Sequence, residues 1–195
     1  QRYKRTEFHG QKWAKNIGFV ENYGVVSHAK LGGFELDFGL FRSLNEFEKS
    51  HSDLMFDTDA NGNVGQRIIV ADRDDYSRST SGEVRLSRAF VEGQRRHKLI
   101  ASVRGRSLKR SYGGSALIDL GASYSGREDF RPEPIASFGP KTFDSVSQMN
   151  FGLGYELRWQ KVGEFSAGIQ KLDYSKRVET PGGILPETKD NGWLY

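Results

Sequence analysis

The residues best suited to metal chemistry in this 195-residue chain lie at positions 57–62. Asp57, Asp59 and Asn61 alternate ahead of Gly62, as oxygen ligands do in the first half of a calcium-binding loop. The twelfth position of such a loop should carry a bidentate Glu, but here it is Ile68. We therefore favour a polar Asn-Gly hairpin tip and keep Asp57, Asp59 and Asn61 only as a weak calcium candidate.

Residue types that serve as nucleophiles or acid–base catalysts form no recognisable active site. The chain has no Cys, and residues 121–126 miss the G-x-S-x-G nucleophile elbow by one position. We expect every histidine to lie in a turn or loop, because none has metal-ligand spacing: His9, His28, His51 and His97. The sequence thus predicts no enzymatic activity and no cofactor.

Basic residues are concentrated between positions 95 and 110. The intervening residues are mainly aliphatic, whereas a nucleic-acid site would interleave aromatic residues for base stacking. The net charge of +4 is also modest for such a partner. We therefore expect no nucleic acid to bind the cluster, which comprises Arg95, Arg96, Lys98, Arg104, Arg106, Lys109 and Arg110.

The clearest structural element is a strand over residues 146–160, followed by a second strand over 164–176. Period-two alternation separates an apolar face from a polar face, and it scatters the aromatic residues around any helix. The apolar set in the first strand is Met149, Phe151, Leu153, Tyr155, Leu157 and Trp159. A tight turn at 161–163 joins the two strands. This turn predicts the pairs Arg158–Ser166, Trp159–Phe165 and Leu157–Ala167.

Connections of alternating length complete the predicted order of strands. We expect strands at 33–42, 80–90 and 97–110, and a less regular strand at 13–25. Short turns are predicted at 27–32, 91–96 and 161–163. Long excursions are predicted at 43–79, 111–143 and 177–191, the second with room for a small hairpin.

These features favour an all-β fold, namely a segment of an antiparallel transmembrane β-barrel. Mean hydropathy is −0.64, and no apolar run reaches the roughly 18 residues of a membrane helix. The predicted strands exceed the 5–6 residues usual in a soluble β-sandwich. Trp159 and Tyr174 are expected to end the apolar face as an interfacial girdle. A soluble β-sandwich binding module and a small, self-closed outer-membrane barrel with a structural or adhesive role stay open as alternatives.

Several segments resemble the barrel strands of TonB-dependent receptors. They are residues 81–88 (Ser-Gly-Glu-Val-Arg-Leu-Ser-Arg), 96–99, 102–106, 112–114, 144–148, 154–155, 163–164 and 193–195. The resemblance covers most of residues 33–195. It implies a bacterial outer-membrane barrel of roughly 22 strands with a plugged lumen, which imports a scarce nutrient such as a ferric siderophore. The TonB complex would act through the plug.

No plug domain, signal peptide or barrel-closing strand is recognisable, so we expect residues 1–195 to be an internal part of one barrel domain. As a fragment it should form an open, curved meander of about eight strands. The side chains expected to face lipid are Phe151, Leu153, Tyr155, Leu157, Phe165, Ala167 and Ile169. Those expected to face the lumen are Glu83, Arg85, Arg104, Arg106, Asn150, Glu156, Arg158, Ser166 and Gln170. Outer-membrane lipid and an unidentified small molecule are the expected partners.

Overall fold

The computed structural model describes residues 10–125 and 128–195 of the chain. Within these residues it contains nine strands, and no helix there is long and apolar enough to cross a membrane. The strands are β1 (Ile17–Leu31), β2 (Phe34–Thr58), β3 (Asn63–Glu92), β4 (Arg95–Tyr112), β5 (Ala116–Tyr124), β6 (Thr142–Trp159), β7 (Gly163–Thr180), β8 (Gly183–Ile184) and β9 (Thr188–Leu194).

Backbone hydrogen bonds join the strands into one open antiparallel sheet in the order β1-β2-β3-β4-β6-β7-β8. In addition, β5 pairs with β3 and β9 pairs with β7. Among the described residues, β1 and β9 lie at opposite edges and do not pair with each other. The predicted all-β class and the open antiparallel sheet are therefore confirmed.

The described chain forms two compact units. Unit 1 combines the residues up to Phe19 with Asn45–Tyr76 and Ser111–Thr142, and unit 2 combines Val20–Leu44, Ser77–Arg110 and Phe143–Tyr195. The long strands β2 and β3 each contribute one part to unit 1 and the other part to unit 2.

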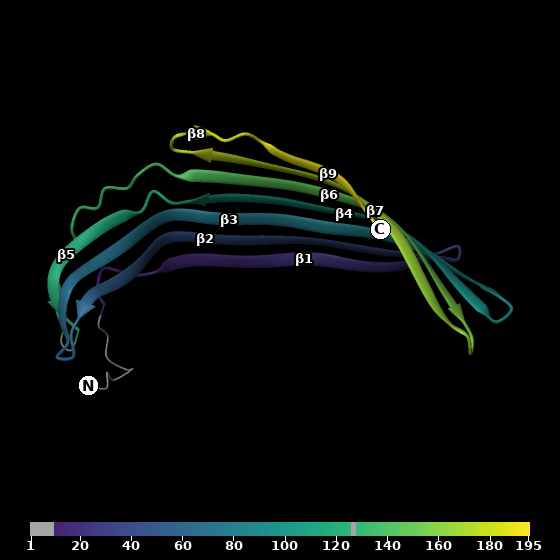
Figure 1. Cartoon of the computed structure of the whole chain (residues 1–195), viewed down its shortest axis with the longest axis horizontal. Coiled ribbons are helices and arrows are strands. Elements are labelled where there is room, and N and C mark those ends of the chain that lie inside the picture. The colour runs from purple at the N-terminus through teal and green to yellow at the C-terminus, as the bar shows by residue number, and fades with distance from the viewer. Residues whose placement is uncertain (1–9, 126–127) are drawn as a thin grey trace. The chain divides into compact units, whose positions relative to one another are not determined.

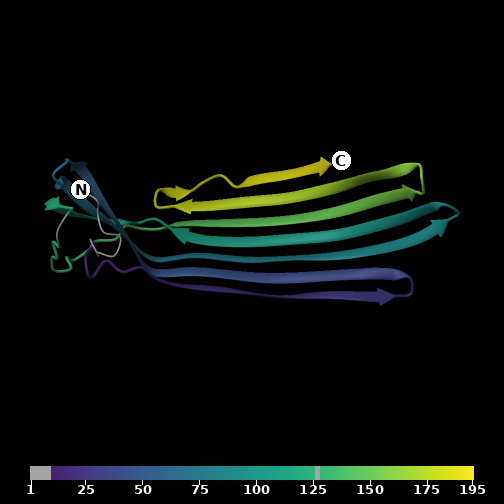
Figure 2. The ribbon, with the colours of Figure 1, turned by 90° about the horizontal axis from the view of Figure 1, so that it is seen from below.

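Short turns connect neighbouring strands of unit 2, which lie side by side in Figures 1 and 2. Gly32 and Gly33 join β1 to β2 with φ of 56° and 84°. This left-handed conformation at both central positions favours glycine in a two-residue hairpin. Gly93, with φ of 57°, opens the turn between β3 and β4. The turn predicted at 27–32 therefore lies at Gly32-Gly33 instead, because the Gly-Gly pair takes the positive-φ positions.

The turn between β6 and β7 comprises residues 160–162, one position earlier than predicted. Val162 N donates to Trp159 O at 3.0 Å, and Lys161 adopts φ of 64°. Arg158 consequently pairs with Glu164, and Leu157 pairs with Phe165. The predicted pairs Arg158–Ser166, Trp159–Phe165 and Leu157–Ala167 were therefore wrong by two residues. A two-residue displacement leaves every side chain on its predicted face, because strand side chains alternate with period two.

The excursion predicted at 43–79 consists mostly of strand, and the hairpin tip expected near Asn61-Gly62 is confirmed within it. β2 extends to Thr58 and β3 begins at Asn63, with a hairpin tip between them. Polar and charged residues interrupt the alternation in this stretch, which is why the pattern did not reveal the strands. In the excursion predicted at 111–143, β5 forms no hairpin of its own but pairs with β3 from Asn63 to Ala71.

Unit 1 contains the buried apolar core of the described residues. Ile69 and Ala71 of β3 pack with Ala116, Ile118 and Leu120 of β5, and partly buried Trp13, Ala14, Ala136 and Phe138 cover them. β3 and β5 bury this face because their apolar residues come together across the pairing.

A buried ion pair lies beside this core. The Arg67 side chain is only 1% exposed, and its Nε and Nη2 donate to the Asp53 carboxylate at 2.9 and 2.6 Å. Bidentate Arg–carboxylate bonds of this kind offset part of the cost of removing both charges from water. The carboxylate also holds the pKa of Arg67 above its usual value.

Asp129 connects the segment after β5 to this network. Arg131 Nη2 donates to Asp129 Oδ2 at 2.8 Å, and Ser123 Oγ donates to the same oxygen at 2.9 Å. The Arg131 guanidinium, Ser123 and Arg67 hold the pKa of Asp129 below its ordinary value. Gln11 Nε2 donates to Asp129 O at 2.6 Å, which attaches the first described residues to the same segment.

Acid should weaken unit 1 through Asp129. A carboxyl group whose pKa is lowered by folding stabilises the folded state. This stabilisation is complete at pH values above the pKa of the same group in the unfolded chain, about 3.9 for Asp. That stabilisation is lost as the pH falls through the folded pKa. Hydrogen-exchange protection of β5 amides, corrected for intrinsic rates, should therefore decrease between about pH 5 and pH 3.

Asp129→Asn should reduce the hydrogen-exchange protection of the β5 amides already at pH 5 and should show a smaller further decrease on acidification. Glu128→Gln, which changes an exposed neighbouring carboxyl group, should behave like the wild type. An identical pH profile for wild type and Asp129→Asn would contradict the role of Asp129.

Candidate functional site

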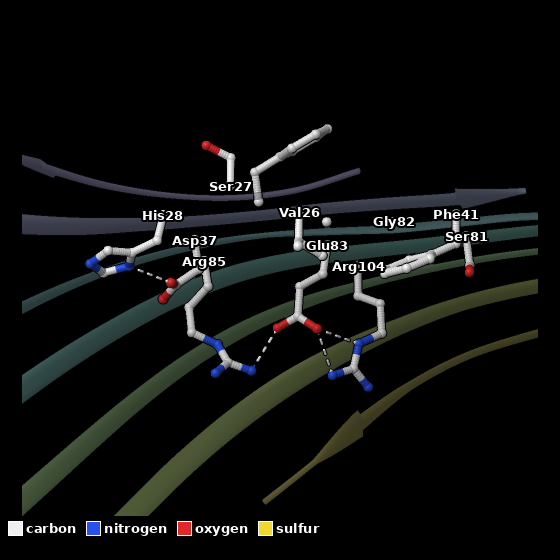
Figure 3. A pocket seen from close by; sticks show the side chains of 12 residues that line it. Val26, Ser27, His28, Asp37, Phe41, Ser81, Gly82, Glu83, Arg85 and Arg104 are labelled. Atoms are coloured by element: carbon white, nitrogen blue, oxygen red, sulfur yellow. Dashed lines mark hydrogen bonds and ion pairs between the residues drawn. The ribbon is translucent and has the colours of Figure 1, made fainter. Parts of the chain in front are cut away.

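A row of charged side chains crosses β1 to β4 on one face of unit 2, here called the polar face (Figure 3). His28 of β1 and Asp37 of β2 approach to 2.8 Å between Nδ1 and Oδ1. On β3, Arg85 Nη2 donates to Glu83 Oε1 at 2.7 Å. Arg104 of β4 donates to Glu83 Oε2 from Nη2 at 2.8 Å and from Nε at 3.1 Å. Glu83 thus holds two guanidinium groups, one on each side.

The short turns explain why these residues meet. Leu31 and Phe34 flank the Gly32-Gly33 turn, so equal steps back along β1 and forward along β2 bring His28 opposite Asp37. The turn at Gly93 does the same for Glu83 and Arg104. Local turn geometry therefore fixes contacts between residues that are far apart in the sequence.

A shallow hollow of about 510 Å³ lies among these charges. Val26 and Phe41 supply its apolar part, and Glu83, Arg85 and Arg104 contribute its polar groups. The Phe41 ring lies against β1, where a Cβ on Gly24 would come within 2.5 Å of its Cδ1. Gly24 is therefore needed for the aromatic ring to lie across the two strands.

The charges of the polar face are solvated rather than buried. Side-chain exposure is 27% for Glu83, 46% for Arg85 and 61% for Arg104. Such pairs stabilise a fold only weakly. The guanidinium groups retain further N–H donors beyond those bound to Glu83, and such donors are suited to holding anionic groups.

The opposite face of unit 2, here called the apolar face, exposes large hydrophobic side chains. Exposure reaches 64% for Leu153, 56% for Phe165 and 50% for Phe151. The same face continues onto β4 and β3 through Leu99 and Leu86, which are also exposed. Alternation therefore produces a broad apolar surface that remains uncovered in the described structure.

Cations stack on aromatic rings near both ends of the apolar face. Arg95 lies 4.3 Å from the Trp159 ring centroid, beside the turns, and Lys171 lies 5.9 Å from that of Trp193. Tyr174, which was predicted to end the apolar face, pairs with Gln148 and shares the polar face. That prediction was wrong because Tyr174 has the opposite parity to Phe165 and Ile169; Trp193 of β9 is the aromatic residue on the apolar side.

The residues predicted to share each face do so. Leu153 pairs with Ile169, Tyr155 with Ala167 and Leu157 with Phe165, whereas Glu156 pairs with Ser166 and Gly152 with Gln170. The polar set is not one cluster. Glu83, Arg85 and Arg104 meet, but Arg158 pairs with Glu164 at 2.6 Å, and Arg106 and Asn150 lie farther along the face. The assignment of the apolar face to lipid and of the polar face to the lumen remains a prediction.

Histidine positions were predicted poorly. His28, His51 and His97 lie in strands β1, β2 and β4 rather than in turns or loops, and His9 lies outside the described residues. The Gly-Gly turn at 32–33 was the signal that would have placed His28 opposite Asp37.

The weak calcium candidate is a hairpin tip closed by its own hydrogen bonds. Asp59 Oδ1 accepts from Asn61 N and Asn63 N at 2.9 Å each, and Oδ2 accepts from Asn63 Nδ2 at 2.8 Å. These bonds hold the pKa of Asp59 below its ordinary value. Over residues 10–125 and 128–195, no group of three or more Asp, Glu or His side chains is placed to hold a metal ion.

Comparison of the sequence with models of known protein families finds no match, and comparison with curated proteins finds none either.

The exposed pair Glu83–Arg104 should contribute little to folding. In a double-mutant cycle with Glu83→Gln and Arg104→Gln, the coupling in the free energy of unfolding should be about 0.2–1 kcal/mol. Glu83→Gln combined with Arg106→Gln is the control and should give no coupling, because Arg106 makes no ion pair with Glu83 in the described structure. Coupling above about 2 kcal/mol would mean that the pair is desolvated.

Proposed function

We propose that this chain forms part of the barrel wall of a TonB-dependent receptor in a bacterial outer membrane, for energised uptake of a scarce nutrient such as a ferric siderophore. The observation that carries the proposal is the division of unit 2 into an exposed apolar face and a charged face. Lipid would cover the first, and the lumen of the barrel would solvate the second.

Exposure of the apolar face favours lipid over a soluble β-sandwich. In a sandwich, the apolar face of one sheet is buried against a second sheet. Leu153, Phe165 and Phe151 are instead at least half exposed. Burial of apolar area contributes about 25 cal/mol per Å², so a surface of this kind requires a partner phase. Hydrocarbon supplies one without a second sheet.

The distance along the strands between the two cation–tryptophan pairs fits the thickness of a membrane. On β6, Trp159 marks one end of the apolar stretch, and Phe151 lies opposite Lys171, which pairs in turn with Trp193. The segment from Phe151 to Trp159 has about the 9–11 residues that a tilted spanning strand needs. Aromatic girdles at both interfaces are typical of outer-membrane barrels.

The charged face and the free edges favour a wide barrel. An eight-stranded barrel has an interior just wide enough for side chains, which leaves little room for solvated Arg85, Arg104 and Glu83. Unpaired strand edges are not tolerated in hydrocarbon, so β1 and β9 would pair with further strands. Assignment to TonB-dependent receptors rests on the resemblance of segments such as residues 81–88 and 112–114.

An arginine on the apolar face should impair membrane assembly. Leu153→Arg would place a charge in hydrocarbon at a cost of about 2–4 kcal/mol, whereas Asn150→Arg faces water in the proposed lumen. In the full-length protein, Leu153→Arg should reduce the folded outer-membrane fraction, measured by heat-modifiable gel migration. Asn150→Arg should not. Equal effects of the two variants would refute the proposed sides of the sheet.

Nutrient uptake should require an energised TonB complex. Cells that express the full-length protein should accumulate at least one of a panel of radiolabelled ferric siderophores. Cells without TonB, or treated with a protonophore, should bind it at the surface without accumulating it. If the protein assembles correctly in the membrane but accumulates the siderophore without TonB, the outer-membrane barrel assignment would stand and the assignment to TonB-dependent receptors would be rejected.

A further inference from the structure

We propose that the apolar face carries a binding site for one glycerophospholipid, with an acyl chain in a hollow between β3 and β7 and the phosphate on Arg88. The inference rests on the proposed function, because it requires the apolar face to lie in a membrane.

The hollow crosses β3, β4, β6 and β7, which are neighbours in the sheet (Figure 2). Its volume is about 700 Å³ and its lining is mostly apolar. Ala101 of β4 and Ala167 of β7 are small, and larger residues such as Leu86, Leu153 and Tyr155 surround them. Small side chains between large ones leave a depression of the size that ligand pockets have, about 300–1,000 Å³.

Arg88 places a positive charge at this hollow, on the apolar side of β3. Its guanidinium carbon lies 5.0 Å from the centroid of the Phe34 ring, and both residues line the hollow. In the described part of the chain, Arg88 has no carboxylate partner. The nearby Glu92 carboxylate instead lies 3.6 Å from His97 Nε2. Arg88 is thus an exposed cation without a protein counter-ion on a surface assigned to lipid.

Charge complementarity selects the occupant. An unpaired arginine on a lipid-facing surface is costly unless it reaches an interface or an anion. Arg88 stacks on Phe34, which directly follows the Gly32-Gly33 turn, so its long side chain can extend toward the headgroup region beside that turn. A phosphate accepts two parallel bonds from a guanidinium. An acyl chain attached to that phosphate then lies across the neighbouring strands, in the Ala101–Ala167 depression.

The test measures retained lipid on the purified full-length protein in detergent by native mass spectrometry. Palmitoyl-oleoyl-phosphatidylglycerol is compared with palmitoyl-oleoyl-glycerol, which has the same chains without the phosphate. Arg88→Gln should reduce retention of the phospholipid about tenfold through loss of a charge-assisted bond. Lys98→Gln, which removes a cation from the polar face of the adjacent strand, should leave retention unchanged.

A second variant tests the hollow itself. Ala101→Phe should lower retention of both lipids by filling the depression, whereas Val103→Phe, the next apolar-face residue of β4, should not. Equal retention by Arg88→Gln and wild type, or equal retention of the two lipids by wild type, would overturn the proposal. Heat-modifiable migration of each variant reports folding. If the membrane assignment itself is wrong, Leu153→Arg and Asn150→Arg will have equal effects on heat-modifiable migration. If only the lipid site is wrong, these two variants will still differ, and only the lipid retention measured by mass spectrometry will contradict the proposal.

Discussion

The short turns of unit 2 fix the strand registers on which all the described side-chain contacts of its two faces depend. A register determines which residues lie opposite each other, and period two determines which face they share. The Gly32-Gly33 turn brings His28 to Asp37, and the turn at Gly93 brings Glu83 to Arg104. A slip of one residue at either turn would place charges on the apolar face and hydrophobic residues on the polar face.

The two units use polar groups in different ways. In unit 2, the ions of the polar face are partly exposed, so their mutual attraction is weakened by water and they remain able to bind other groups. In unit 1, Arg67 is almost fully buried and needs the Asp53 carboxylate, because an unpaired buried charge would strongly destabilise the fold. In the proposed receptor, the first set would bind solutes, whereas the second maintains the structure of unit 1.

The apolar face joins the proposed function to the proposed lipid site. Its hydrophobic residues are spread over neighbouring strands, so no single residue creates the surface. Arg95 and Lys171 sit on tryptophan rings near its ends, where a cation can remain close to water. Arg88 differs from these two because it stacks on Phe34 and lines the hollow that contains both Ala101 and Ala167, and this placement gives it its role in the lipid proposal.

The sequence by itself determined the all-β class and the face of each residue in β6 and β7, because alternation is a local property that survives even a two-residue error in pairing. Tyr174 was misplaced only through a miscounted parity. Only the tertiary structure decided that β2 and β3 continue beyond the predicted strands, that β5 joins β3, and that Arg67 is buried against Asp53. These features depend on contacts between distant residues, and strands rich in polar residues carry little alternation to reveal them. His28 and Asp37 were not predicted as partners for a different reason. Their pairing depends on the exact position of one turn, which was predicted at 27–32 and lies at Gly32-Gly33.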